Sequence, residues 1–275
     1  PEAIGAKALA VALSDLAAMG AEPGEAYVQL GLPEGVGEDE LRRIADGLGT
    51  LAASHGVAVA GGDVVGSPVL FLAITVVGHA PDAASFVSRA GARAGEALVL
   101  AGRLGGAAAG LILLERPELA AAVDAATGDA LIERQTRPTA LIEAGRTLAA
   151  SGASAMIDVS DGLGADAGHI ARSSGVRLEI DLPGEAIVMG VEEVAGAAGL
   201  DPIELAAGGG EDYSLLAAIP RERLDEALEA LQGLDPAVIG RVEEGEGVVL
   251  RGPTGREASA GGFDQIRSRA RDAPT

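Results

Sequence analysis

The sequence predicts a two-domain protein of class α/β to α+β with mixed sheets. Strand-like and helix-like segments alternate along most of the 275 residues, and hairpin-like pairs of strands interrupt that alternation. The apolar pattern weakens over residues 81–93, and the length favours two cores. We therefore expect an N-terminal domain over residues 1–82 and a C-terminal α/β domain over residues 83–275.

The N-terminal domain is expected to contain two helices and three strands. Residues 2–19 and 38–54 carry apolar side chains at helical spacing. Strands are expected at residues 26–32, 57–60 and 69–78. The apolar stretch within the last of these is far shorter than the roughly 20 residues of a membrane helix, so it predicts a buried strand.

The C-terminal domain continues the alternation of strands and helices. Strands are expected at residues 98–100, 155–159, 176–180 and 212–218, with closing strands over 237–249. Helices are expected at residues 105–114, 139–150 and 221–231, together with one that opens at Ser160-Asp161-Gly162 and runs to Ser174.

The composition narrows the classes of function. A net charge of −21 argues against binding to nucleic acid, which requires clustered basic residues, and against an anionic membrane surface. Phosphate can still bind if divalent cations lie between it and the carboxylates. The absence of cysteine excludes thiolate catalysis and Cys-ligated metals. No signal peptide is visible, so the cytoplasm is the expected compartment.

Five segments share one pattern, an acidic residue beside glycines or other small residues. They are Ser14–Gly20, Gly61–Asp63, Asp158–Leu163, Gly208–Tyr213 and Gly261–Asp264. Glycine allows a ligand to approach the backbone closely, and carboxylates are the oxygen ligands that Mg²⁺ accepts alongside phosphate. Together the segments indicate magnesium-dependent phosphoryl transfer, in which several metal ions can hold the attacking and leaving oxygens.

Each segment alone has a structural explanation. An Asp beside a Gly commonly forms a turn or caps a helix, and Asp161 is a candidate cap for the helix that follows it. Asp15 lies within a helical pattern, where a solvent-facing position would also explain it. The three histidines are not clustered, and no Walker A or zinc-protease motif occurs in the right context.

In their order, these segments resemble the thiamine-monophosphate kinase family of the aminoimidazole-ribonucleotide-synthetase-like superfamily. The matching stretches are residues 4–23, 61–63, 102–111, 158–175 and 208–216, with Gly240–Val242 and Gly262–Asp264. The resemblance implies the two-domain fold of that superfamily. It also implies direct transfer of the γ-phosphoryl group of ATP to thiamine monophosphate, several Mg²⁺ ions and a homodimer.

The resemblance also implies roles for particular residues. The expected metal ligands are Asp15, Asp63, Asp158 and Asp161; the expected ATP contacts are Gly62, Arg89 and Ser160; the expected thiamine contacts are Glu211 and Phe263. No protein nucleophile is expected, so positioning and charge neutralisation would account for the rate.

The chain departs from the family in three places. It begins without Met inside a helical pattern, Val64, Val65 and Gly66 follow Gly-Gly-Asp, and Gln265 replaces a histidine. The family has a further N-terminal segment with metal ligands, so we expect the N-terminal domain here to be incomplete. We also expect turnover by this chain to be at least about a thousandfold lower than turnover by a protein that has that segment. The alternatives are a non-enzymatic fragment or another ATP-using member of the superfamily. The members that use Cys or selenocysteine are disfavoured.

Overall fold

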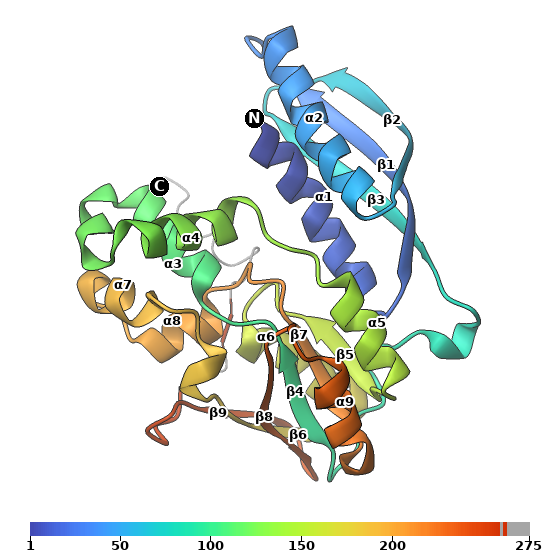
Figure 1. The fold of residues 1–275 in the computed structure, drawn as a ribbon, viewed down its shortest axis with the longest axis vertical. Helices are drawn as coiled ribbons and strands as arrows, with labels where there is room; N and C mark the ends of the chain where they lie inside the picture. The colour runs from blue at the N-terminus through green and yellow to red at the C-terminus, as the bar shows by residue number, and fades with distance from the viewer. Residues whose placement is uncertain (259–260, 263–275) are drawn as a thin grey trace, which may run out of the picture.

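Helix α1 (Glu2–Ala17) packs against both sheets of the computed structural model, which describes residues 1–258 and 261–262. The helix starts beside the three-stranded sheet, and its C-terminal end meets the larger, six-stranded unit (Figure 1). Among the described residues, no helix combines the length and apolar character needed to cross a membrane.

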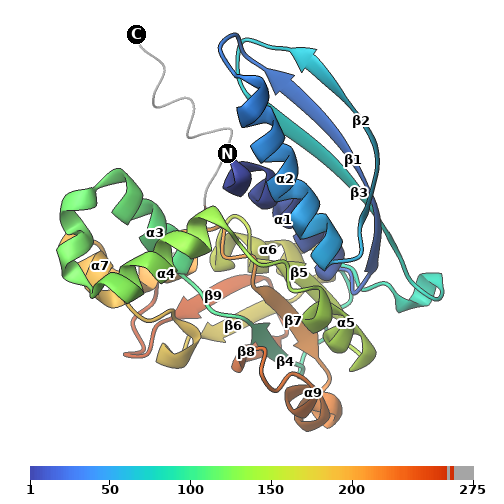
Figure 2. The ribbon, with the colours of Figure 1, turned by 45° about the horizontal axis from the view of Figure 1, so that its top comes forward.

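The smaller sheet has β1 (Glu22–Leu32) at its centre. β2 (Ala58–Gly66) pairs with β1 in parallel and β3 (Phe71–His79) pairs with it antiparallel. α1 and α2 (Glu38–Ser54) cover one face (Figure 2), where Leu9, Leu13 and Leu48 form a core with Ala26. The opposite face, which we call the outer face, is exposed.

Two predictions about these strands are wrong. The strand expected to end at Ala60 continues to Gly66, because the β-branched Val64 and Val65 extend it beyond the glycines. Gly62 is part of this strand, and a Cβ there would lie 2.1 Å from the carbonyl oxygen of Val28. β3 is not buried on both faces, since alternate residues from Phe71 onward are exposed.

The larger sheet is mixed, as predicted. Its strands lie in the order β5 (Ala155–Asp158), β7 (Leu215–Ile219), β4 (Ala97–Ala101), β8 (Pro236–Glu243), β6 (Arg177–Asp181) and β9 (Gly247–Arg251). β6 and β9 are parallel, and the other neighbouring pairs are antiparallel.

Helices cover both faces of this sheet. The side chains of β4, at its centre, point alternately to the two faces and pack in the two cores. Leu98 and Leu100 pack in the core that includes residues of α3 (Gly106–Glu115) and α6 (Leu163–Ser174). Val99 and Ala101 pack in the core that includes residues of α5 (Ile142–Ala150) and α9 (Leu224–Ala230). Ala17, in the last turn of α1, belongs to this second core.

Three further helices were not predicted. They are α4 (Ala125–Thr136), α7 (Val191–Ala198) and α8 (Pro202–Gly208). The carboxylates of Asp124 and Asp201 cap α4 and α8 by accepting backbone N–H bonds. Short 3₁₀ turns occur at Ala83–Ser85, Pro117–Ala122, Gly184–Ala186 and Arg221–Arg223. The helix expected from residue 139 begins at Ile142, and the strand expected from residue 212 begins at Leu215.

Candidate functional site

A cavity of about 410 Å³ separates the C-terminal end of α1 from β5. Its lining includes Asp15, Arg89 and Asp158, three of the residues that the sequence singles out. Asp15 is exposed at the rim, whereas the side chain of Asp158 is only 6% exposed. Residues from three distant segments therefore meet at this point.

The pKa values of the two carboxylates in this cavity are both raised. Ser14 Oγ donates a 2.7 Å hydrogen bond to Asp158 Oδ2. Burial raises the pKa of Asp158, and the negative charge of Asp15 raises it further. Burial also raises the pKa of Asp15, while the guanidinium of Arg89 partly offsets the effect. Such groups gain from a bound cation, which favours their ionised forms.

The loop after β5 presents Ser160 and Asp161. The prediction that Asp161 caps the following helix is wrong. The N-cap residue of α6 is Gly162, at a φ of +117°, and no side chain forms a capping hydrogen bond there. Instead, Asp166 Oδ2 accepts the backbone N–H groups of Ser160, Asp161 and Gly162 at 3.0, 3.0 and 3.1 Å. Burial raises the pKa of Asp166 to about 7. The Asp161 carboxylate is thereby left free of a capping bond.

A second loop, before β7, presents Glu211. Glu211 has a positive φ of 60°, and its N–H donates to the carbonyl of Ser160 at 2.8 Å. Its carboxylate oxygen Oε2 accepts from Lys7 Nζ at 3.1 Å and from Gln135 Nε2 at 2.8 Å. The loops of Asp161 and Glu211 are thus bonded to each other, and the second loop also contacts α1 and α4.

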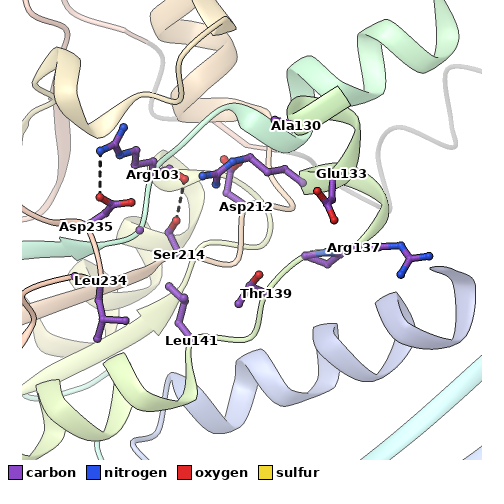
Figure 3. A pocket seen from close by; sticks show the side chains of 14 residues that line it. Arg103, Ala130, Glu133, Arg137, Thr139, Leu141, Asp212, Ser214, Leu234 and Asp235 are labelled. Carbon is purple, nitrogen blue, oxygen red and sulfur yellow. Dashed lines mark hydrogen bonds and ion pairs between the residues drawn. The ribbon is translucent and has the colours of Figure 1, made fainter. Parts of the chain in front are cut away.

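Asp212 anchors this second loop to the start of α3. Its carboxylate accepts the N–H groups of Gly105 at 2.7 Å and Ala107 at 3.1 Å, where the helix dipole favours negative charge. Burial nevertheless raises the pKa of Asp212 to about 6. Asp212 also lines a cavity of about 420 Å³ beside Arg103 and Ser214 (Figure 3). None of the predicted site residues within the described part of the chain lines that cavity.

The charges that act on Tyr213 indicate which of the predicted site residues lie near one another. The tyrosine side chain is buried, which raises its pKa. The negative charges of four predicted site residues raise it further, namely Glu211, Asp158, Asp161 and Asp15. These four form a cluster of negative charge near Tyr213, and Asp63 is not one of them. Phe263 lies outside the described residues.

Asp63 lies on the outer face of the smaller sheet. It is paired in register with Gln29 on β1 and is exposed, and its Oδ1 accepts the N–H of Val64 at 2.9 Å. α1, which carries Asp15, packs on the opposite face. No described contact joins Asp63 to the cluster around Tyr213.

The donors fit magnesium in part. Among residues 1–258 and 261–262, no three acidic or histidine side chains are grouped as a metal site. Asp15 and Asp158 do share one cavity, and Mg²⁺ commonly binds through one or two carboxylates together with water and phosphate oxygens. The donor chemistry therefore suits Mg²⁺ that arrives with a nucleotide.

Four contributors to the site were not predicted: Lys7, Ser14, Gln135 and Asp166. One signal was available for Lys7, because it is the only lysine among 20 basic residues. Lys7 and Ser14 are also seven positions apart, which places them on one face of α1. Gln135 and Asp166 carry no such signal, since their importance depends on tertiary contacts.

Comparisons with known proteins show the family of this chain. Residues 1–80 match the family described as AIR synthase related protein, N-terminal domain, and residues 93–252 match its C-terminal domain. The thiamine-monophosphate kinase of Aquifex aeolicus is 37% identical over 254 residues, which are 92% of this chain and 78% of that protein. The chain belongs to the thiamine-monophosphate kinase family.

Solved structures of this kinase family share the fold. The thiamine-monophosphate kinase of Stenotrophomonas maltophilia K279a has a TM-score of 0.82 at 37% identity, with 94% of this chain and 80% of that chain covered. AaThiL complexed with AMPPCP and TMP also has a TM-score of 0.82, at 36% identity, with 96% and 81% covered. The likeness to these kinases therefore extends across both sheets.

Proposed function

We propose that this protein phosphorylates thiamine monophosphate to thiamine diphosphate with ATP as the phosphoryl donor. The observation that carries the proposal is the similarity to AaThiL, whose structure holds TMP and the ATP analogue AMPPCP. The relatives named thiamine-monophosphate kinase match about nine-tenths of this chain. Because ATP is the donor, we place the reaction in the cytoplasm.

The spacing along α1 supports a site for two substrates. Lys7 contacts Glu211, and Ser14 contacts Asp158. Seven residues of α-helix span about 10 Å, so the backbone positions from which Lys7 reaches Glu211 and Ser14 reaches Asp158 are about that far apart. The cationic thiamine portion suits the carboxylate of Glu211, and the phosphates suit the Asp158 end.

In the proposed reaction, a phosphate oxygen of thiamine monophosphate attacks the γ-phosphorus of ATP. The bond from that phosphorus to the β,γ-bridging oxygen breaks, and ADP leaves. Bound Mg²⁺ would neutralise charge on the transferring phosphoryl group. We assign Asp15, Asp158 and Asp161 to holding the metal, and Arg89 and Ser160 to contacting ATP. The protein then contributes positioning and charge stabilisation without a covalent intermediate.

We also propose a homodimer formed through the outer face of the smaller sheet. Tyr27, Val65, Phe71 and Val77 are exposed there, and apolar patches of this kind are typical of interaction surfaces. Asp63 lies on the same face, and Gly62 is its neighbour on β2. A metal role for Asp63 and an ATP contact by Gly62 therefore require the second subunit.

Product analysis tests the proposed function. The protein is incubated with ATP, Mg²⁺ and one acceptor, either thiamine monophosphate, thiamine or inorganic phosphate, and the products are separated by chromatography. We expect thiamine diphosphate from thiamine monophosphate and no phosphorylated product from the other two acceptors. Phosphorylation of thiamine alone, or of no acceptor, would contradict the proposal.

A further inference from the structure

Two side chains hold the same oxygen of Glu211. Lys7 Nζ, from α1, and Gln135 Nε2, from the last turn of α4, both donate to Oε2. Lys7 Nζ also donates to the backbone oxygen of Gln135 at 2.7 Å, so the three residues form a closed set of contacts. No described residue donates a hydrogen bond to Glu211 Oε1. The carboxylate therefore has one committed oxygen and one available oxygen.

Gln135 is oriented by Glu211. The side chain is 8% exposed, and its amide must turn Nε2 toward the carboxylate, because the opposite orientation would place two acceptors together. That orientation leaves Gln135 Oε1 buried without a hydrogen-bond partner among the described residues. An unpaired buried acceptor lowers stability. The fold tolerates this cost at the residue that holds Glu211.

Lys7 supplies a compact charge that reaches both partners. Every other basic side chain apart from the histidines is arginine, whose planar guanidinium binds in a different geometry. The ammonium lies at the C-terminal end of α4, where the helix dipole favours a cation. α1 is fixed two turns further on by the Ser14–Asp158 hydrogen bond, so the position of Lys7 is tied to the metal-binding end of the site.

We propose that Lys7 and Gln135 are positioning residues that hold Oε2 of Glu211 and leave Oε1 to accept the thiamine portion of the substrate. This inference rests on the proposed function, because it assigns the substrate end of that site. A carboxylate with one fixed oxygen loses little freedom when the ligand binds, and such preorganisation increases affinity. The effect belongs to thiamine monophosphate and not to ATP.

A double-mutant cycle separates positioning from general structural damage. Gln135→Leu removes the donor at similar volume, and Gln232→Leu, at an exposed glutamine, is the matched control. We expect Gln135→Leu to weaken binding of thiamine monophosphate about tenfold or more by calorimetry, with AMPPCP affinity within twofold of wild type. In a Glu211→Ala background, the same substitution should change the affinity for thiamine monophosphate less than twofold.

Lys7→Met gives a second, independent readout. Charge alone would tighten the binding of a cationic ligand when Lys7 is removed, whereas loss of positioning would weaken it. We expect at least fivefold weaker binding and a raised KM, with a smaller change in kcat. Tighter binding in Lys7→Met, or a loss in Gln135→Leu that persists without the Glu211 carboxylate, would overturn the inference while leaving the proposed function intact. A wild-type protein that forms no thiamine diphosphate would overturn both.

Discussion

Ser14 Oγ donates a buried 2.7 Å hydrogen bond to Asp158 Oδ2 although the two residues are 144 positions apart. The bond joins α1, beside the smaller sheet, to the end of β5 in the larger sheet. Lys7 makes the second link from the same helix face, to Glu211. α1 therefore determines how the proposed metal-binding and substrate-binding ends of the site are placed relative to each other.

The first prediction concerns this bond. Ser14→Ala leaves a buried carboxylate without its donor, which should lower the free energy of unfolding by about 1–3 kcal/mol. Because Asp158 loses its orientation, the concentration of Mg²⁺ needed for half-maximal activity should rise. Denaturant unfolding and a Mg²⁺ titration measure the two effects. Ser54→Ala, whose hydroxyl bonds only within and beside α2, is the control and should change neither.

The second prediction concerns the carboxylates proposed as metal ligands. Asp15→Asn and Asp161→Asn should each reduce kcat by about 10²-fold or more, because a neutral amide binds Mg²⁺ poorly and the transition state loses stabilisation. Steady-state kinetics with saturating ATP and thiamine monophosphate provides the measurement. The exposed Asp225→Asn serves as the control. Full activity in either site variant would remove that residue from the metal role.

The third prediction concerns the loop that carries Ser160 and Asp161. Asp166→Ala removes the acceptor of three backbone N–H groups, so the free energy of unfolding should fall by about 3 kcal/mol. The loop should also exchange its amide hydrogens faster than in the wild type. Hydrogen exchange at residues 160–162 tests this directly. Unchanged protection there would show that Asp166 does not hold the loop.

The fourth prediction is a pH dependence. Burial raises the pKa values of Asp158 and Asp15, and metal binding requires both carboxylates to be ionised. A raised pKa moves the loss of metal affinity to higher pH, so Mg²⁺ binding should weaken on acidification at a higher pH than it would for carboxylates with the ordinary aspartate pKa of about 4. Calorimetric Mg²⁺ titrations in the presence of AMPPCP between pH 5 and 8 measure this. Constant affinity across that range would contradict the prediction.

The fifth prediction concerns the outer face of the smaller sheet. Val65→Asp places a charge in the proposed interface, where an unpaired charge is costly to bury. The variant should shift from dimer to monomer in sedimentation velocity and lose activity if Asp63 acts across subunits. Val238→Asp changes an exposed valine of β8 and should leave the oligomeric state unchanged. A wild type that is monomeric at micromolar concentration would rule out the proposed dimer.

Periodicity predicted the elements that bury one clear stripe of apolar residues. The predicted range of α2, residues 38–54, matches the structure, and the mixed character of the larger sheet was also predicted. α4 was missed because Gly128 and several polar residues obscure its apolar stripe. The strand containing Asp63 was misjudged because consecutive glycines resemble a turn when the neighbouring strand is not visible.

The site could be predicted only in part, because the positions of some of its residues depend on strand register and on contacts between segments that are distant in sequence. Asp15, Asp158, Asp161 and Glu211 stand out in sequence because each lies beside small residues, and the negative charges of all four raise the pKa of Tyr213. Strand register decides that Asp63 lies on the outer face, and register is a property of the folded sheet. The positive φ of Glu211 depends on its bond to Ser160, a contact that no local pattern indicates.

The most direct test is whether this protein forms thiamine diphosphate. The rate is measured with ATP and thiamine monophosphate, with and without Mg²⁺, for the wild type and for Asp158→Asn. We predict Mg²⁺-dependent formation of thiamine diphosphate by the wild type, and a loss of about 10²-fold or more in the variant. No thiamine diphosphate from the wild type, or an equal rate after removal of divalent metal by a chelator, would contradict it.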